Sequence, residues 1–299
     1  MNRRRKVRRI QAAVLALVLL LLGTQALGAA AYAGLFARRM ETPAAYREEL
    51  SRYPGLTRRE VPFSNADGTV LTGWLYTGTQ TPVRGLLVAA HGMGFGHLAY
   101  LRVIDSFARQ GWLVFAYDGT GYDASGGAGI GGPPQAMLDL DAALTAAEAL
   151  PETEGLPVCL FGHSMGAYAV CTVLPRHPEV RAAAVLAGFD SVSALVRARL
   201  GLPGMVLVPG ALLWERLRFG EDAGRTALEG FAASEAQLLI VHGTADDEVP
   251  ISCGLDRFEA ACGGDPRFTF LRVEGADHGS LFTPEVREAC LELFAEACE

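Results

Sequence analysis

Six short runs of apolar residues follow one another between residues 84 and 275, and segments with helical spacing separate them. Each run is continuously apolar rather than alternating, as in a strand of a parallel sheet that is covered on both faces. The runs are RGLLVAAHG, GWLVFAYDG, LPVCLFGHS, VRAAAVLAG, AQLLIVHG and RFTFLRVEG. The preceding segment EVPFSNADGTVLTGWLYTG predicts an antiparallel hairpin, because Asp-Gly favours the positive φ values of a tight turn. The sequence therefore predicts an α/β fold with a mostly parallel, doubly wound sheet of about eight strands.

The N-terminal segment has a different character. Residues 10–37 carry no charged side chain and follow a basic tail at residues 1–9. This length is enough to cross a bilayer, so we predict a transmembrane signal anchor. Two alternatives stay open: a signal peptide cleaved after the triplet Ala31-Tyr32-Ala33, which would release the body, and a buried core helix. Because most of the basic residues precede the span, the positive-inside rule predicts that the body lies outside the cytoplasm.

The distribution of charge and the positions of proline and glycine divide the rest of the chain into segments. Residues 1–39 hold eight basic side chains and no acidic one, so the net charge of −7 leaves −15 for the remainder, which argues against a nucleic-acid partner. Residues 38–59 are polar and interrupted by proline, which predicts a linker or a short helix that leads into the folded domain of residues 60–299. Within it, the interval from about 190 to 235 is apolar but broken by proline and glycine, which predicts a helical cap.

Ser164 is the candidate nucleophile. It lies in G-H-S-M-G, directly after an apolar run and before a segment compatible with a helix. A serine on such a turn projects its hydroxyl from a strained backbone, and the flanking glycines avoid collisions with neighbouring backbone. The motif alone is weak, because a shuffled chain of this composition contains it with a probability of roughly 0.14. The evidence therefore has to come from partner residues.

A serine hydroxyl needs a base, and the base needs an acid that orients it. Three of the six histidines follow Ser164, namely His177, His242 and His278. His242 opens the strand-end motif HGTADDEVP, and His278 in the glycine-flanked EGADHGSLF is the predicted base. Both Asp246 and Asp247 follow a strand end by a few residues, and by chemistry alone they are nearly equal candidates for the acid.

An acyl-transfer site also needs two backbone N–H groups for the oxyanion. Met165, which follows the nucleophile, supplies the first. The loop HGMGFGH follows the first parallel strand, and its glycines let backbone approach a substrate closely, so Met93 is the predicted second donor. We expect His91 to brace this loop, and we favour a packing or cap-contacting role for His97 over a catalytic one.

Other patterns carry less weight. The stretches at residues 119–124 and 127–132 fit a dinucleotide motif loosely, with Asp139 twenty residues beyond Gly119, but a long loop follows them instead of a helix. We therefore expect no nucleotide cofactor. No cysteine and histidine spacing matches a zinc site, so we predict no metal.

The six cysteines could pair in an oxidising compartment. Cys159 and Cys171 lie in apolar stretches, where buried free thiols are usual. The sequence leaves open whether the other four form bridges, namely Cys253, Cys262, Cys290 and Cys298.

Five motifs in order resemble the α/β-hydrolase superfamily: HGMG, YDGTGYDASGG, GHSMG, HGTADDEVP and DHGS. The resemblance runs from about residue 60 to the end, and with the N-terminal span it is similar to bacterial membrane-anchored serine hydrolases. It implies the α/β-hydrolase fold with a small cap, and it favours Asp246 over Asp247 as the acid. Many relatives carry arginine as D-x-R-G where this chain has Gly119-Thr120-Gly121, a departure that alters the floor of the pocket.

These observations predict a serine hydrolase that cleaves a carboxylic ester or thioester through a triad and an acyl-enzyme. The apolar cap beside a bilayer weakly favours a lipid-like substrate. Two alternatives stay open: a serine peptidase or amidase on the same fold, and a non-catalytic binding protein that retains the fold. The predicted site consists of Ser164, Asp246 and His278, with the backbone N–H groups of Met93 and Met165.

Overall fold

The computed structural model describes residues 3–298, and these contain eight strands that form one sheet in the order β1-β2-β4-β3-β5-β6-β7-β8. The first two residues of the predicted basic tail lie outside the described residues. The strands are β1 (Thr57–Ser64), β2 (Val70–Thr77), β3 (Gly85–Ala90), β4 (Trp112–Asp118), β5 (Val158–His163), β6 (Val180–Leu186), β7 (Gln237–Gly243) and β8 (Phe268–Val273). All six predicted apolar runs are strands, and the predicted fold class is confirmed.

β1 and β2 form the predicted antiparallel hairpin, whose turn includes Gly68 at φ +77°. β2 also pairs antiparallel with β4, and every other neighbouring pair is parallel. The central strands β3 and β4 are buried along their whole length, which explains their continuous apolar sequence. The carboxyl ends of the parallel strands therefore meet at one edge of the sheet.

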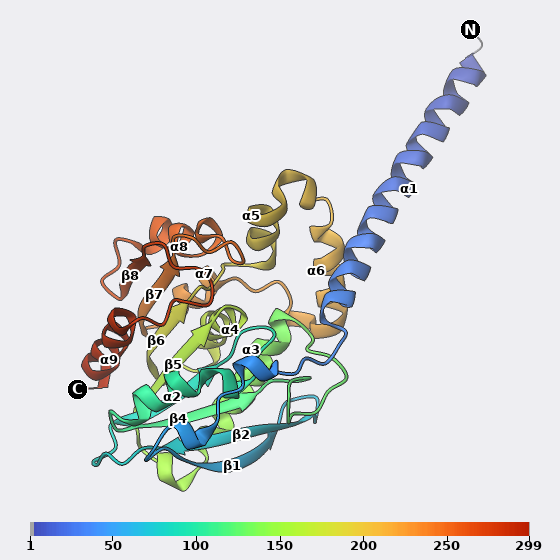
Figure 1. Ribbon diagram of the computed structural model, residues 1–299. Helices are drawn as coiled ribbons and strands as arrows, with labels where there is room; N and C mark the ends of the chain where they lie inside the picture. Colours follow the sequence, from blue (N-terminus) through green and yellow to red (C-terminus); the bar gives the residue numbers. More distant parts are fainter. Residues whose placement is uncertain (1–2, 299) are drawn as a thin grey trace.

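Helices cover both faces of this sheet (Figure 1). One buried cluster joins the sheet to α3, α4, α7 and α8, and a second joins the opposite face to α2 and α9. The α-helices are α1 (Arg3–Phe36), α2 (Leu101–Ala108), α3 (Pro133–Glu148), α4 (Met165–Val173), α5 (Val192–Gly204), α6 (Val208–Phe219), α7 (Ala227–Ala232), α8 (Leu255–Cys262) and α9 (Pro284–Cys298). Short 3₁₀ helices are η1 (Ala44–Tyr46), η2 (Leu50–Arg52), η3 (His97–Tyr100), η4 (Pro151–Thr153), η5 (Leu174–Arg176), η6 (Gly220–Asp222) and η7 (Ile251–Cys253).

α1 projects from the domain as one long helix (Figure 1). Within residues 3–298 it is the one helix that is long and apolar enough to cross a membrane, from Arg4 to Phe36. Its lower part lies against α6 of the interval predicted as a cap, where the structure has α5, α6 and α7 between β6 and β7.

The segment predicted as a linker, residues 38–59, runs along the domain. The Met40 backbone N–H donates to Gly121 O at 2.9 Å, and Thr42 is buried. Farther along, Leu50, Tyr53 and Leu56 pack against the sheet face that α2 and α9 cover. β1 begins at Thr57, inside the predicted linker range.

All six cysteines are free thiols in the structure. Cys159, Cys171, Cys253 and Cys290 are buried, and Cys262 and Cys298 are half-buried. The Cys159 and Cys298 sulfur atoms lie 3.7 Å apart.

Candidate active site

Ser164 lies between the end of β5 and the start of α4, at φ 55° and ψ −120°. A non-glycine residue with positive φ is strained, and here the strain turns the side chain out of the strand-to-helix connection. A Cβ at Gly162 would collide with the Gly166 carbonyl, and one at Gly166 would collide with the Ala90 carbonyl. Both glycines of the motif are therefore required by close backbone packing.

The structure brings His278 and Asp246 to this serine from the loops after β8 and β7. The Ser164 Oγ lies 2.8 Å from His278 Nε2, and His278 Nδ1 lies 2.7 Å from Asp246 Oδ2. Because an ionised carboxylate only accepts hydrogen bonds, Nδ1 carries the proton and Nε2 is left to accept from the serine hydroxyl. Asp247, by contrast, is exposed and lines the cleft above Ser164.

Asp246 is held by backbone as well as by the imidazole. Its Oδ1 accepts from the N–H groups of Glu248 and Val249 at 2.9 and 2.8 Å. Burial acts to raise the pKa of Asp246, but the hydrogen bonds from His278 and Val249 outweigh it and leave the pKa below its usual value. The carboxyl is therefore ionised at neutral pH and its orientation is fixed.

Both predicted oxyanion donors flank the serine. Met165 is the first residue of α4, and Met93 lines the cleft together with Ser164. Within residues 3–298, neither backbone N–H has a hydrogen-bond partner. Two free N–H groups, one of them at a helix N-terminus, are the donors that a developing oxyanion would need.

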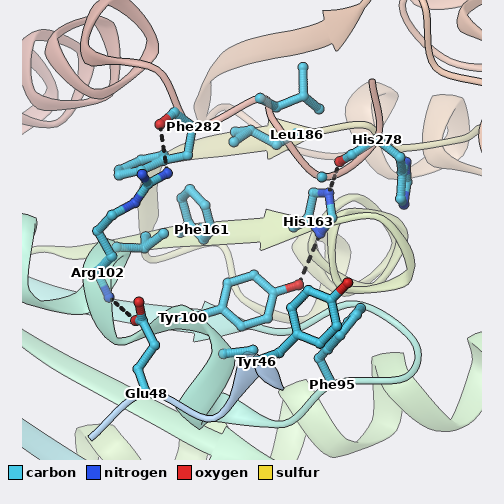
Figure 2. A pocket seen from close by; sticks show the side chains of 14 residues that line it. Tyr46, Glu48, Phe95, Tyr100, Arg102, Phe161, His163, Leu186, His278 and Phe282 are labelled. Carbon is cyan, nitrogen blue, oxygen red and sulfur yellow. Dashed lines mark hydrogen bonds between the residues drawn. The ribbon is translucent and has the colours of Figure 1, made fainter. Parts of the chain in front are cut away.

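A hydrogen-bond chain that the sequence did not predict connects the loop at Gly92, the turn at Ser164 and the loop at His278. Figure 2 shows its links from Tyr100 through His163 to His278. The Gly92 N–H donates to Tyr100 Oη at 3.0 Å, and that hydroxyl lies 2.9 Å from His163 Nδ1. The other ring nitrogen of His163 lies 2.9 Å from the His278 carbonyl oxygen. Burial and the nearby His278 lower the pKa of His163 to about 4, so the neutral ring accepts at Nδ1 and donates at Nε2.

The only sequence signal for this chain is that His163 occupies the variable position before Ser164. Nothing in the sequence predicts that Tyr100, in the 3₁₀ helix that follows the oxyanion loop, reaches it. A second unpredicted brace comes from the N-terminal segment: Thr42 Oγ1 accepts from the Gly96 N–H at 2.6 Å, and Thr42 donates its backbone N–H to Asp123 at 2.8 Å.

The two upstream histidines support loops. His91 Nε2 accepts from the Gly119 N–H at 2.9 Å, and its Nδ1 lies 2.9 Å from Gly92 O, as expected for a bracing residue. His97 is buried, lies 2.8 Å from Asp118 and stacks on Trp74 with ring centroids 3.7 Å apart, which is a packing role away from the cap.

The loop after β4, which has Gly119-Thr120-Gly121 in place of D-x-R-G, is not among the residues that line the two hollows beside Ser164, so the expected change to the pocket floor is not observed there. Thr120 donates both its backbone N–H and its hydroxyl to Asp139, at 2.6 and 2.8 Å. Asn65 and Gln135 also donate to this buried carboxylate, each from its side-chain amide. Asp139 therefore anchors the glycine-rich loop from α3.

Two connected hollows lie beside the serine. A cleft of about 390 Å³ lies above Ser164, and an apolar cavity of about 290 Å³ lies behind it. His163 and His278 line both hollows, and Figure 2 shows the apolar one. The apolar cavity is walled by Phe95, Val103, Phe161, Leu186, Leu281 and Phe282.

One further group of side chains has the composition of a metal site. Glu148, His177 and Glu179 offer ligand atoms within 4.8 Å of one another. His177 already lies 2.6 Å from Glu179 and 2.8 Å from Asp141, so ion pairing accounts for its orientation. The cluster adjoins none of the serine-site residues.

Known proteins resemble this chain in sequence and in fold. Residues 81–200 match the family model described as serine aminopeptidase, S33. A monoacylglycerol lipase of Mycolicibacterium smegmatis is 31% identical over 192 residues, which cover 62% of this chain and 67% of that protein.

Among solved structures, an esterase of Pyrococcus furiosus has a TM-score of 0.67 at 19% identity and covers 87% of this chain and 97% of its own. An α/β hydrolase from a Penicillium species has a TM-score of 0.59 at 18% identity and covers 81% of this chain and 99% of its own. At these identities the likeness concerns the fold.

Proposed function

The chain belongs to the α/β-hydrolase superfamily, and from that premise we propose that it is a serine hydrolase that cleaves carboxylic esters or thioesters with an apolar portion. Its esterase- and lipase-like relationship supports the reaction class. The observation that carries the proposal is the continuous hydrogen-bond line from Ser164 through His278 to Asp246.

The proposed reaction follows from these contacts. As the Ser164 Oγ bonds to the carbonyl carbon, its proton passes to His278 Nε2, and Asp246 stabilises the imidazolium. The N–H groups of Met93 and Met165 stabilise the oxyanion. The intermediate collapses when the C–O or C–S bond breaks and the leaving group takes the proton from Nε2. Water then repeats the sequence and releases the acid.

The hollows support the substrate class. The apolar cavity adjoins His278 and is lined mostly by aromatic and aliphatic side chains, with Glu48 and Arg102 also in its wall, which favours an acyl chain or another largely apolar group. Esters also suit the site because an alkoxide or thiolate leaves more easily than an amine.

The N-terminal helix and its basic tail support single-pass membrane attachment through residues 10–37. By the positive-inside rule the hydrolase domain, residues 60–299, lies on the extracytoplasmic side.

A second candidate is an aminopeptidase, which the description of the matched family favours. Three exposed acidic residues line the cleft above Ser164, and they could bind a substrate ammonium group: Asp247, Glu248 and Asp277. The same triad would then act on an amide.

The test combines covalent labelling with a substrate panel. The wild-type chain should react with a fluorophosphonate probe and hydrolyse 4-nitrophenyl esters with a preference for longer acyl chains. Ser164→Ala should lose both, whereas Ser51→Ala, which removes an exposed serine hydroxyl, should keep both. Absence of labelling in folded wild type would refute the hydrolase, and faster turnover of aminoacyl 4-nitroanilides than of esters would favour the peptidase.

A further inference from the structure

The cap carries a group of exposed apolar side chains beside α1. Leu200 and Leu202 lie in the C-terminal part of α5, on either side of its kink at Gly201, and Val206 lies between α5 and α6; they are 59%, 70% and 55% exposed. Soluble surfaces rarely gather side chains of this kind, and such a group marks an interaction site. Its position next to the apolar helix narrows the choice of partner.

α1 is docked on α6, and the two helices run in the same direction (Figure 1). The Gln25 side chain donates to Val206 O at 3.1 Å, and farther down Tyr32 donates to the buried carboxylate of Glu215. Gly28 meets the Leu207 backbone and Gly210 meets the Gln25 backbone so closely that a Cβ at either glycine would collide. The tip of the cap is therefore held at the level of Gln25–Gly28.

The length of the part of α1 that precedes its contact with α6 determines how deep Gln25–Gly28 would lie in a bilayer. The 15 residues from Ile10 to Thr24 span about 22 Å at 1.5 Å per residue, whereas a hydrocarbon core is about 30 Å thick. If the core begins at Ile10, after the basic tail, roughly 8 Å of it remains below Thr24. That depth is the range in which interfacial segments bury their apolar face, about 5–10 Å.

Farther along α6 lie aromatic and basic side chains of the kind found at the headgroup level of a membrane. Trp214 contacts Tyr32 with ring centroids 5.5 Å apart, and its ring also receives the guanidinium of Arg218. Arg216 and Arg218 are exposed, and Arg38 and Arg39 follow α1. Aromatic side chains concentrate at the level of lipid headgroups because their rings are amphipathic, and basic side chains there are attracted by anionic lipids.

We propose that the tip of the cap, defined as Leu200, Leu202 and Val206, inserts into the leaflet that borders the catalytic domain, and that the substrate is therefore an ester drawn from a lipid bilayer. This rests on the proposed function only for the identity of the substrate; the insertion itself does not depend on hydrolysis. Arg199, in α5 before the kink at Gly201, donates to Glu248 O at 2.7 Å, and Glu248 lines the cleft above Ser164. The inserted cap is thus joined to the rim of the site.

The test measures depth directly in the full chain, reconstituted into vesicles of phosphatidylcholine and phosphatidylglycerol. Single cysteines are introduced as Leu202→Cys, Leu20→Cys and Val83→Cys in a Cys262→Ser/Cys298→Ser background, since the remaining cysteines are buried. Each is labelled with an environment-sensitive fluorophore. Val83 lies before β3, at the end of the sheet opposite Ser164, and serves as the aqueous control.

We expect nitroxide groups on lipid acyl chains to quench the labels at Leu20 and Leu202, and iodide in the buffer to quench only the label at Val83. Quenching at Leu20 with an iodide-accessible Leu202 would overturn insertion of the cap while leaving the span intact. A Leu202 label that neither quencher reaches would show a protein partner, such as a second copy, and would also overturn it. Quenching at neither apolar position would refute span and insertion together.

A matched activity assay tests the substrate source. The pair Leu200→Asn/Leu202→Asn should lower the rate on an ester presented in vesicles by about tenfold or more, because one leucine side chain contributes at least that factor in transfer free energy. Its rate on a soluble short-chain ester should stay within about twofold of wild type. Equal losses on both esters would refute a bilayer source, and no turnover of either by wild type would refute the hydrolase but not the insertion.

Discussion

The edge of the sheet and the cap with α1 contrast in how they are held together. At the sheet edge, Ser164, Asp246 and His278 are held by polar contacts of 2.7–2.8 Å and by the ends of the three strands that they follow, β5, β7 and β8. Between α1 and α6, the helices are held together by close backbone contact at Gly28 and Gly210. Leu200 and Leu202 nearby remain exposed. The comparison teaches that a reactive site needs oriented dipoles in buried surroundings, whereas the docking of two apolar helices needs close backbone packing.

The two regions meet at one small apolar cluster. Tyr32 and Phe36 of α1 pack with Met165, the residue after the proposed nucleophile. Helix α1 is therefore in contact with the segment that supplies one of the proposed oxyanion donors. Three predictions test this contrast, in order from the largest expected effect to the smallest.

The largest effect is expected at the acid. Asp246→Asn should reduce kcat/KM by about 10³–10⁴, because the amide would not hold the imidazole with Nε2 free to accept a proton. Asp247→Asn is the matched control and should change it by less than about tenfold, since its side chain is exposed and does not contact His278. A larger loss of kcat/KM in Asp247→Asn than in Asp246→Asn would assign the role of the acid to Asp247. The contacts of Asp246 would then not explain activity.

The second prediction, of intermediate size, concerns how His163 makes the stability of the fold depend on pH. Because burial and His278 lower the pKa of His163 to about 4, the folded state resists a proton that the unfolded chain accepts near pH 6.5. The contribution is complete above about pH 6.5 and declines as the pH falls towards 4, by on the order of 3 kcal/mol.

The measurement is denaturant unfolding of the full chain in detergent micelles at both ends of this window. His163→Phe should show a smaller loss of stability on acidification than wild type. It should also lower kcat by about tenfold or more, since the His278 loop loses the hydrogen bond to its carbonyl. An unchanged pH profile in the variant would remove His163 as the source of the effect.

The mildest change probes the packing between α1 and the cap. Tyr32→Phe leaves the buried carboxylate of Glu215 without its tyrosine donor and should lower the free energy of unfolding by about 1–3 kcal/mol. Tyr46→Phe, at an exposed tyrosine, should lower it by less than about 0.5 kcal/mol. Thermal unfolding in micelles compares them, and equal shifts would argue against a specific lock between the helices.

Much of the fold was predictable because a buried strand appears in the sequence as a short continuous run of apolar residues. Continuous apolar runs predicted β3 to β8, and Asp67-Gly68 predicted the first hairpin. The hydrogen-bond chain through Gly92, Tyr100, His163 and the His278 carbonyl was not predictable, since its members come from a loop, a 3₁₀ helix, a strand end and a second loop that are up to 186 residues apart. The docking of residues 38–59 was also missed, because a polar segment with prolines has the same composition whether it packs or not.

The sequence by itself determined the strands, the apolar N-terminal helix and the small set of residues capable of the chemistry. It did so because periodicity and turn chemistry act over a few residues at a time. Only the tertiary structure decided that Asp246 and not Asp247 contacts His278, and that α1 lies against α6. These depend on the direction in which loops leave a finished sheet and on helix surfaces more than 170 residues apart in the chain. Distances of that kind are fixed by packing, which no local pattern records.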